Sequence, residues 1–167
     1  RQYVLLIDRS GSMSWPDRGR SSRWKSAQRV AEALVPALFR HDVDKSIPVY
    51  LFDSNVTFVG ECTDVSQVQT IFSEYQPGTT TNLAEALDVA METYLGSKRA
   101  NYELVPGTTF IVILDGGADD TAAVIRTLQK YADPENGYIV NHTQAAVSFI
   151  QIADDASATE FLQSLDD

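Results

Sequence analysis

Three oxygen-bearing side chains stand at alternating positions early in the chain: Asp8, Ser10 and Ser12, with Gly11 between the two serines. Alternate residues of a chain that leaves a strand can point the same way, and a glycine lets the backbone turn there without a Cβ penalty. A carboxylate and two hydroxyls, without nitrogen or sulfur, suit a small hard cation such as Mg²⁺. Because Mg²⁺ takes about six oxygens, further donors must come from elsewhere in the chain, from water or from a ligand.

Two other segments can supply such oxygens. Asp115 directly follows an apolar run at residues 108–114 and precedes two glycines. The loop at residues 78–82 leads into an expected helix and holds three threonines: Thr79, Thr80 and Thr81. The expected site therefore joins three segments that are far apart in the sequence, and the fold has to bring them together.

The elements that position these residues alternate between buried strands and amphipathic helices. Continuous apolar runs predict strands covered on both faces at residues 3–7, 47–52, 108–114 and 145–152. Residues 56–59 are expected to return as an antiparallel edge strand. Helical periodicity predicts helices at residues 22–40, 65–75, 119–131 and 156–165, and another that runs to residue 95. Thr81 or Asn82 is expected to cap that last helix, and Pro36 to kink or break the first one.

This alternation predicts a doubly wound, Rossmann-like α/β fold in a single domain spanning residues 1–167. Its sheet is expected to be mostly parallel, with one short antiparallel edge strand and helices on both faces. In such sheets, ligands bind outside the carboxyl ends of the strands, where the strand order switches direction. Asp8 and Asp115 both follow buried strands, so we expect them to meet at that edge.

With these residues in order, the chain resembles the von Willebrand factor A (vWA) domain family, which includes the integrin I domains. The metal-ion-dependent adhesion site (MIDAS) of that family combines an Asp-x-Ser-x-Ser motif, a distant threonine and an Asp-Gly. The first motif is present unchanged at residues 8–12. The family's Thr-Asn-Leu-x-x-Ala-Leu pattern aligns with residues 81–87 and favours Thr81 as the metal threonine, with Thr79 and Thr80 as alternatives. Asp115 fills the Asp-Gly position, although Leu114 stands where the family has a threonine.

The resemblance implies a role for each of these residues. Ser10, Ser12 and, in one state of the site, Thr81 would bind the ion directly, while Asp8 and Asp115 would bind through water or exchange with it. Mg²⁺ is the expected ion, with Mn²⁺ or Ca²⁺ as alternatives, and an Asp or Glu of a partner protein would complete the coordination. A cation held mostly by neutral hydroxyls keeps excess positive charge, which attracts a carboxylate. The expected function is thus a divalent-cation-dependent protein-binding module for adhesion or scaffolding, without catalysis.

Two other functions remain open on the sequence. The domain could serve an intracellular complex beside an AAA+ ATPase, as in chelatase-like assemblies; the single cysteine, Cys62, and the absence of a visible leader favour a cytoplasmic setting. A metal-assisted hydrolase is the other, although no general base beyond the metal acids is evident. Ser10 as a nucleophile lacks a Gly-x-Ser-x-Gly elbow, and the only histidines are His41 and His142.

The charge of the chain is unevenly distributed. The formal net charge is −10, which should repel nucleic acid, and no apolar run reaches the roughly 18–20 residues of a membrane span. Residues 9–29 nevertheless carry six cations and one acid, a net +5, against −15 for the rest. We expect a ligand rim beside the metal, formed by Arg9, Trp15, Arg18 and Arg20, with Arg23 as a further cation on the same rim. Its positive charge would steer an acidic partner to the site.

Overall fold

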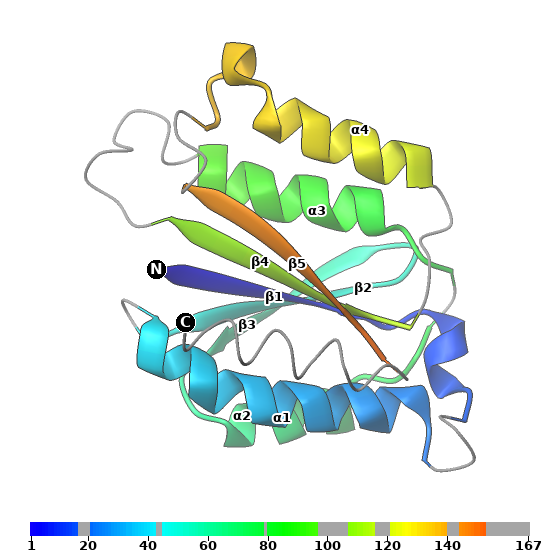
Figure 1. The fold of residues 1–167 in the computed structure, drawn as a ribbon. Coiled ribbons are helices and arrows are strands. Elements are labelled where there is room, and N and C mark those ends of the chain that lie inside the picture. Colours follow the sequence, from blue (N-terminus) through cyan, green and yellow to red (C-terminus); the bar gives the residue numbers. More distant parts are fainter. Residues whose placement is uncertain are drawn as a thin grey trace.

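Five strands form one central sheet in the computed structural model, which describes residues 1–16, 21–42, 45–78, 80–96, 107–115, 121–139 and 144–152. The strands are β1 (Gln2–Asp8), β2 (Ile47–Phe52), β3 (Val56–Cys62), β4 (Thr108–Leu114) and β5 (Ala145–Gln151). Their order across the sheet is β3-β2-β1-β4-β5 (Figure 1). All neighbouring pairs are parallel except β2 and β3, which form an antiparallel hairpin. The expected sheet is confirmed, with an edge strand longer than the predicted 56–59.

Helices cover both faces of the sheet. The longer ones are α1 (Arg23–His41), α2 (Ser66–Glu74), α3 (Leu83–Met91) and α4 (Thr121–Ala132). Shorter helical segments among the described residues are the 3-10 turns η1 (Gly11–Ser14) and η4 (Pro134–Asn136), and the π-helical segment η2 (Glu92–Gly96), which continues α3. In Figure 1, α3 and α4 lie on one side of the sheet and α1 and α2 on the other. The helix expected at residues 156–165 lies outside the described residues, and no helix within them is long and apolar enough to cross a membrane.

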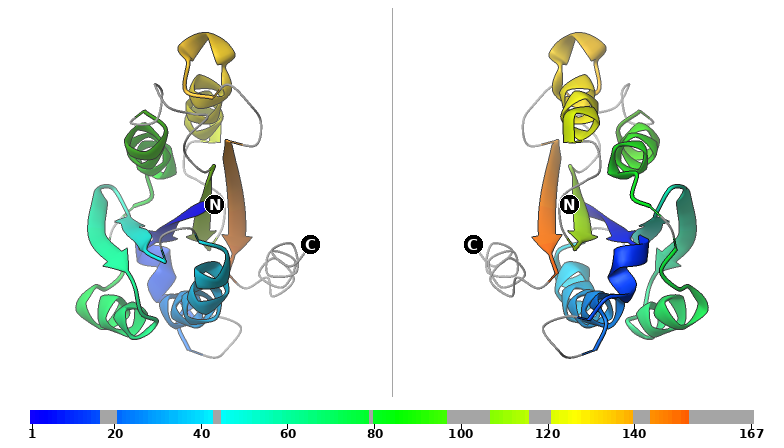
Figure 2. Two further views of the ribbon diagram at one scale, coloured as in Figure 1. Left: turned by 90° about the vertical axis from the view of Figure 1, so that its left-hand side faces the viewer. Right: turned by 90° about the vertical axis from the view of Figure 1, so that its right-hand side faces the viewer.

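The sheet lies between two layers of helices (Figure 2), and an apolar core fills the space on each side of it. Tyr3, Leu5 and Ile7 of β1 pack into the core beneath α1 and α2. The alternate residues Val4 and Leu6 pack into the core beneath α3 and α4. A strand buried on both faces needs apolar residues at every position, which is why β1 appears in the sequence as a continuous apolar run.

The predicted break at Pro36 is wrong, because α1 runs without interruption from Arg23 to His41. A proline inside a helix removes one backbone hydrogen bond and crowds the preceding turn. Here Pro36 lies on the exposed side of the helix, while Leu34, Val35 and Leu38 are completely buried against the sheet. Apolar packing on both sides of the proline therefore offsets its local cost and keeps the helix whole.

The topology selects one edge of the sheet for a ligand. From β1 the chain crosses to β2 on one side, and from β4 it crosses to β5 on the other side. The switch point therefore lies between the carboxyl ends of β1 and β4, where Asp8 and Asp115 stand. This edge is on the right of Figure 1 and faces the viewer in the right-hand view of Figure 2.

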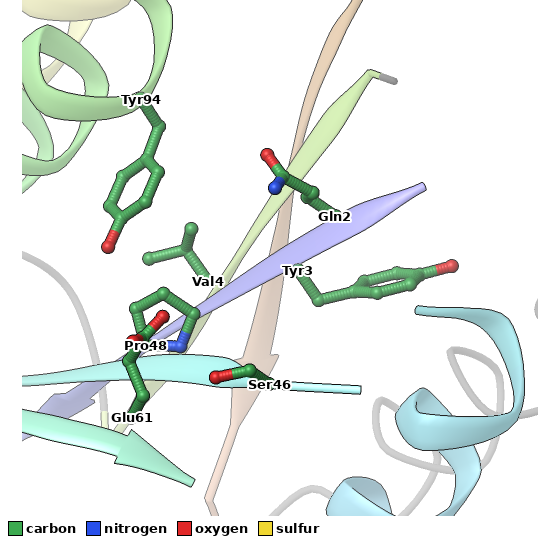
Figure 3. Close-up of a pocket in the computed structure, with 7 residues that line it drawn as sticks. All are labelled: Gln2, Tyr3, Val4, Ser46, Pro48, Glu61 and Tyr94. Atoms are coloured by element: carbon green, nitrogen blue, oxygen red, sulfur yellow. The ribbon is translucent and has the colours of Figure 1, made fainter. Parts of the chain in front are cut away.

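The opposite edge, at the amino ends of the parallel strands, holds a small cavity (Figure 3). Its lining residues are Gln2, Tyr3, Val4, Ser46, Pro48, Glu61 and Tyr94. The volume is about 30 Å³, which is room for a water or two and not for an organic ligand. This cavity is therefore not a candidate for the chemistry expected from the sequence.

Candidate functional site

The turn after β1 gathers the first three residues of the predicted site. Asp8 is 2% exposed, and its Oδ1 accepts the backbone N–H of Ser10 at 2.7 Å. The hydroxyl oxygens of Ser10 and Ser12 lie 3.2 Å apart. The turn η1 coils directly after Ser10, with the N–H of Met13 donating to the Ser10 carbonyl, and the Met13 side chain is fully buried. Met13 thus anchors a turn that presents the carboxylate and both hydroxyls together.

Asp115 joins this turn from the end of β4. The Ser12 hydroxyl donates to Asp115 Oδ2, and Arg23 Nη1 lies 3.1 Å from the same oxygen. Parallel pairing of β1 with β4 brings the two carboxyl ends side by side, so residues 103 positions apart can share a hydrogen bond. The structure therefore brings together the Asp-x-Ser-x-Ser turn and the distant aspartate that the sequence singled out.

The threonine loop is tied to the same edge by its backbone. The N–H of Gly78 donates to the carbonyl of Arg9 at 2.6 Å, and the N–H of Asn82 donates to the carbonyl of Asp53 at 2.7 Å. A Cβ at residue 78 would run into the Asp53 carboxylate, so that side chain would have to move if any other residue replaced this glycine. The loop that carries Thr81 is therefore held between the ends of β1 and β2.

Within that loop, the structure separates the three threonines. Asn82 caps α3, because its Oδ1 accepts the N–H of Glu85 at 3.2 Å. Thr81 is half-buried just before this cap, Thr80 is exposed, and Thr79 lies outside the described residues. The assignment of Thr81 as a metal ligand stays a prediction.

Within the turn, hydrogen bonds compensate the burial of the Asp8 carboxylate only in part. Burial raises the pKa of Asp8 to about 6; hydrogen bonds from Ser10 oppose the rise, and the negative charge of Asp115 adds to it. Two carboxylates and two hydroxyls thus share a site that is rich in acceptor oxygens. A bound cation would favour the ionised form of Asp8 and offset its burial.

The donor set fits a hard divalent cation. Among the described residues, no three His, Cys, Asp or Glu side chains gather in one place, so a cation at this edge would depend on the hydroxyls as well as the carboxylates. An all-oxygen set that mixes one or two carboxylates with neutral oxygens and water is typical of Mg²⁺ and Mn²⁺. The chemistry of the residues is therefore compatible with the ion implied by the motif.

The members of the ligand rim differ in what they contact. Trp15 is 58% exposed beside the site. The Arg9 guanidinium donates twice to the carbonyl of Gln76, at 3.0 and 2.9 Å, and lies over the ring of Tyr75. Arg9 therefore ties the segment before the threonine loop to the end of β1. Arg18 and Arg20 lie outside the described residues, and steering by the rim stays a prediction.

Sequence reasoning counted Arg23 only as one of several cations near the site and missed its ion pair with Asp115. Arg23 is the first residue of α1, where the positive end of the helix dipole disfavours a cation. Because this placement is unfavourable, it could have indicated that the guanidinium pairs with an acidic residue elsewhere in the chain. Its backbone N–H donates to the Trp15 carbonyl at 2.8 Å, which holds the two residues together.

His41, the one histidine among the residues that the structure describes, lies far from the carboxyl edge of the sheet. His41 is the last residue of α1, whereas Ser10 lies near the start of that helix. Nineteen helical residues span about 28 Å, so His41 cannot serve Ser10 as a general base. His142 lies outside the described residues.

Comparison with known proteins identifies a related family. A family model described as the von Willebrand factor type A domain matches residues 3–117, which include the turn after β1, the threonine loop and Asp115. A search of curated proteins found no match.

Solved structures share the fold at low sequence identity. The manganese-loaded TRAP protein of Plasmodium vivax has a TM-score of 0.65 and 20% identity, covering 98% of this chain and 62% of that one. An aerotolerance-related membrane protein of Bacteroides fragilis has a TM-score of 0.64 and 17% identity, covering 90% and 67%. A type V pilus tip protein of Porphyromonas gingivalis, seen as three N-terminal domains, has a TM-score of 0.55 and 18% identity, covering 70% and 20%. The chain thus corresponds to a part of each of these proteins.

Proposed function

The chain belongs to the von Willebrand factor type A domain family, and from this premise we propose that it is a divalent-cation-dependent protein-binding module. The observation that carries the proposal is the hydrogen bond from Ser12 to Asp115, which unites the motif after β1 with the aspartate after β4. The raised pKa of Asp8 supports it, because an acceptor-rich, buried site gains most from a cation. We also propose that residues 1–167 form one such domain, since β5 pairs with β4 beyond the matched residues.

In this proposal, the site is a MIDAS of the kind found in integrin I domains. The hydroxyls of Ser10, Ser12 and, in one state of the site, Thr81 would hold the ion, and Asp8 and Asp115 would bind it through water or exchange with it. The ion is Mg²⁺, with Mn²⁺ or Ca²⁺ as alternatives, and it supplies an attachment point for an acidic group. The manganese in the TRAP structure supports a divalent ion in this fold and makes Mn²⁺ a convenient probe.

The partner in this proposal is a protein that presents an Asp or Glu side chain. Neutral hydroxyl ligands leave the ion with excess positive charge, which a carboxylate can neutralise. The structural likeness to a pilus tip protein is compatible with such a binding role. Binding without catalysis is supported by the position of His41, the one described histidine, at the far end of α1.

Metal titration tests the site. Mn²⁺ added to chelator-treated protein should lose its free-ion electron paramagnetic resonance signal, and Asp8→Asn or Asp115→Asn should weaken binding by at least about tenfold, which corresponds to 1.4 kcal/mol. Asparagine keeps the Oδ1 acceptor for the N–H of Ser10, so the turn is expected to survive. Asp64→Asn is the matched control, because Asp64 follows β3 at the opposite edge and its carboxylate caps Ser66. Equal Mn²⁺ binding by Asp8→Asn and the parent would refute the metal site.

Partner chemistry can be tested with a peptide array in which each peptide carries a single Asp or Glu, beside its Asn or Gln counterpart. Retention of labelled protein should require Mn²⁺ and the acidic member of each pair, and it should disappear in chelator. Retention that is equal for acidic and amide peptides would contradict the proposed carboxylate ligand while leaving metal binding intact.

A further inference from the structure

Arg23 places a permanent positive charge at the edge of the candidate metal site. Its Nη1 lies 3.1 Å from Asp115 Oδ2, and the side chains of Arg23 and Asp115 are 27% and 10% exposed. The same Asp115 oxygen also accepts the Ser12 hydroxyl. One carboxylate oxygen therefore holds both a predicted metal ligand and a resident cation.

The ion pair is built in a way that allows exchange. Only Nη1 of Arg23 is paired with Asp115, although a guanidinium can bind a carboxylate through two parallel hydrogen bonds. Within the described part of the chain, Arg23 Nε is buried and has no acceptor, which is an unfavourable arrangement. The single-point contact is therefore weaker than a two-point pair and easier to displace.

Trp15 provides a second contact for the Arg23 guanidinium. The Arg23 Cζ atom lies 5.4 Å from the centre of the Trp15 ring, within the range of a cation–π contact. Trp15 and Arg23 are also joined through the backbone, so the ring stays close to Arg23 whatever the carboxylate binds. Loss of the contact with Asp115 would leave Arg23 supported on the exposed indole.

We propose that Arg23 is an affinity-determining residue of the metal site: its guanidinium occupies the side of Asp115 that a divalent cation uses, and the cation binds in exchange for it. The inference rests on the proposed metal-dependent function. Arg23 balances Asp115 in the metal-free protein, and its charge lowers the affinity for the ion. An acidic partner group would neutralise both positive charges, so partner and ion are expected to bind cooperatively.

Electrostatics sets the size of the effect. Removing a unit positive charge about 6 Å from a divalent ion, at the dielectric constant of water, raises the affinity for that ion about tenfold. Salt screens such interactions, so the gain should shrink between about 0.05 M and 0.5 M salt. An effect that depends on charge also distinguishes Arg23 from a residue that only shapes the loop.

The test is a Mn²⁺ titration of the full chain followed by electron paramagnetic resonance, comparing the parent with Arg23→Gln, Arg23→Lys and Arg29→Gln. Arg23→Gln should bind Mn²⁺ about tenfold more tightly, whereas Arg23→Lys keeps the charge and should stay within about threefold of the parent. Arg29→Gln is the matched control: Arg29 lies on the same helix, and its guanidinium donates to the hydroxyls of Ser21 and Ser26. Its affinity should stay close to that of the parent.

Each outcome decides a different point. If the parent binds Mn²⁺ and Arg23→Gln binds equally or more weakly, Arg23 does not compete with the ion and this inference is wrong, while the metal-dependent function stands. If Arg29→Gln shows the same gain as Arg23→Gln, net charge explains the effect and the inference also fails. If neither the parent nor any variant binds Mn²⁺, the proposed function fails and this inference fails with it.

Discussion

Two regions of this molecule each bring a pair of carboxylates together, and they treat the pair in opposite ways. The first is the site at the carboxyl edge of the sheet, where Asp8 and Asp115 meet Ser10 and Ser12. The second, which we name the tyrosine cluster, lies between α3 and α4. Its members are Asp88, Glu92, Lys130, Tyr131 and Tyr138.

In the tyrosine cluster, the protein supplies donors to its own carboxylates. The Tyr131 hydroxyl lies 2.8 Å from Asp88 Oδ1 and 3.3 Å from Glu92 Oε2, and the Tyr138 hydroxyl donates to Glu92 at 2.6 Å. Burial raises the pKa of Asp88, but hydrogen bonds from Lys130 and Tyr131 outweigh it and hold that pKa below its usual value. Asp88 is therefore stable in its ionised form without any external ligand.

At the edge of the sheet, burial outweighs the hydrogen bonds to Asp8. Burial raises the pKa of Asp8 to about 6, and nearby Asp115 adds to that rise. Arg23 compensates Asp115, and among the described residues its ion pair is with that carboxylate and not with Asp8. The difference between the regions teaches that paired carboxylates alone do not indicate a metal site. What distinguishes the edge site is a buried acid, Asp8, whose pKa stays raised because hydrogen bonds from the protein do not offset its burial.

The largest expected effect is on the pH dependence of stability in chelator. The pKa of Asp8 is raised from 3.8 to about 6, so the native state binds a proton more tightly than the unfolded state, and stability falls as pH rises between these values by about 3 kcal/mol. Asp8→Asn removes that ionisation. At pH 8 it should therefore be more stable than the parent by up to about 3 kcal/mol, measured by urea unfolding.

The matched control for this experiment is again Asp64→Asn, which removes one charge from an exposed turn and should gain no stability at pH 8. The difference between Asp8→Asn and the parent should vanish below about pH 3, where Asp8 is protonated in both states. Asp88 contributes with the opposite sign: its stabilisation is present above its unfolded pKa and is lost as pH falls through the lower folded value. A parent whose stability in chelator is flat from pH 4 to 7 would remove the contrast between the regions.

The next effect is stabilisation by metal, which should act on one region only. A ligand that binds the native state alone stabilises it by about 2.7 kcal/mol at a hundred times its Kd. Mn²⁺ should therefore raise the unfolding free energy of the parent, and that of Asp8→Asn by no more than about 1.4 kcal/mol, because the variant is expected to bind at least about tenfold more weakly. Tyr131→Phe should keep the full response, because the tyrosine cluster lies between helices away from the edge. A loss of the response in Tyr131→Phe would show that the two regions are coupled.

Much of the fold was predictable because burial leaves a local pattern. The apolar runs in β1 and β4 are continuous since both faces of each strand are covered, and the helices show one apolar face. The meeting of Asp8 with Asp115 followed from a rule of topology, because polar residues after neighbouring parallel strands share an edge. The continuity of α1 through Pro36 was not predictable, since packing against the sheet overrides a local preference.

Side-chain pairings between distant segments were beyond the sequence pattern. Arg23 reaches Asp115 across 92 positions, and Tyr131 reaches Asp88 across 43. Neither pair has a characteristic spacing, and each depends on how two elements pack. The same limit applies to Asp8. Its raised pKa depends on its burial and on the donors around it, which only the three-dimensional structure gives.

A smaller effect is expected from the tyrosine cluster itself. Tyr131 is fully buried, and Tyr131→Phe would remove the hydroxyl that the two carboxylates share, at a cost of about 1–2 kcal/mol by urea unfolding. Tyr75→Phe is a matched control, because Tyr75 is half-buried and no hydrogen bond of its hydroxyl is seen among the described residues. That control should change stability by less than about 0.5 kcal/mol. A Tyr131→Phe protein as stable as the parent would mean that the cluster does not depend on its hydroxyls.

The smallest effect is expected from Lys130. Its substitution tests whether the ammonium charge or the tyrosine hydroxyls stabilise the carboxylates of the tyrosine cluster. Its Nζ lies 3.0 Å from Asp88 Oδ1, but both side chains are 46% exposed. Exposed ion pairs contribute about 0–1 kcal/mol and are screened by salt, so Lys130→Gln should cost less than about 0.5 kcal/mol and nothing measurable in 0.5 M salt. A cost above about 1 kcal/mol that persists in salt would mean that the ammonium, and not the tyrosine hydroxyls, compensates these carboxylates. The two regions would then differ in their cations: Lys130 would remain bound to its carboxylate, whereas Arg23 would be displaced by a metal ion.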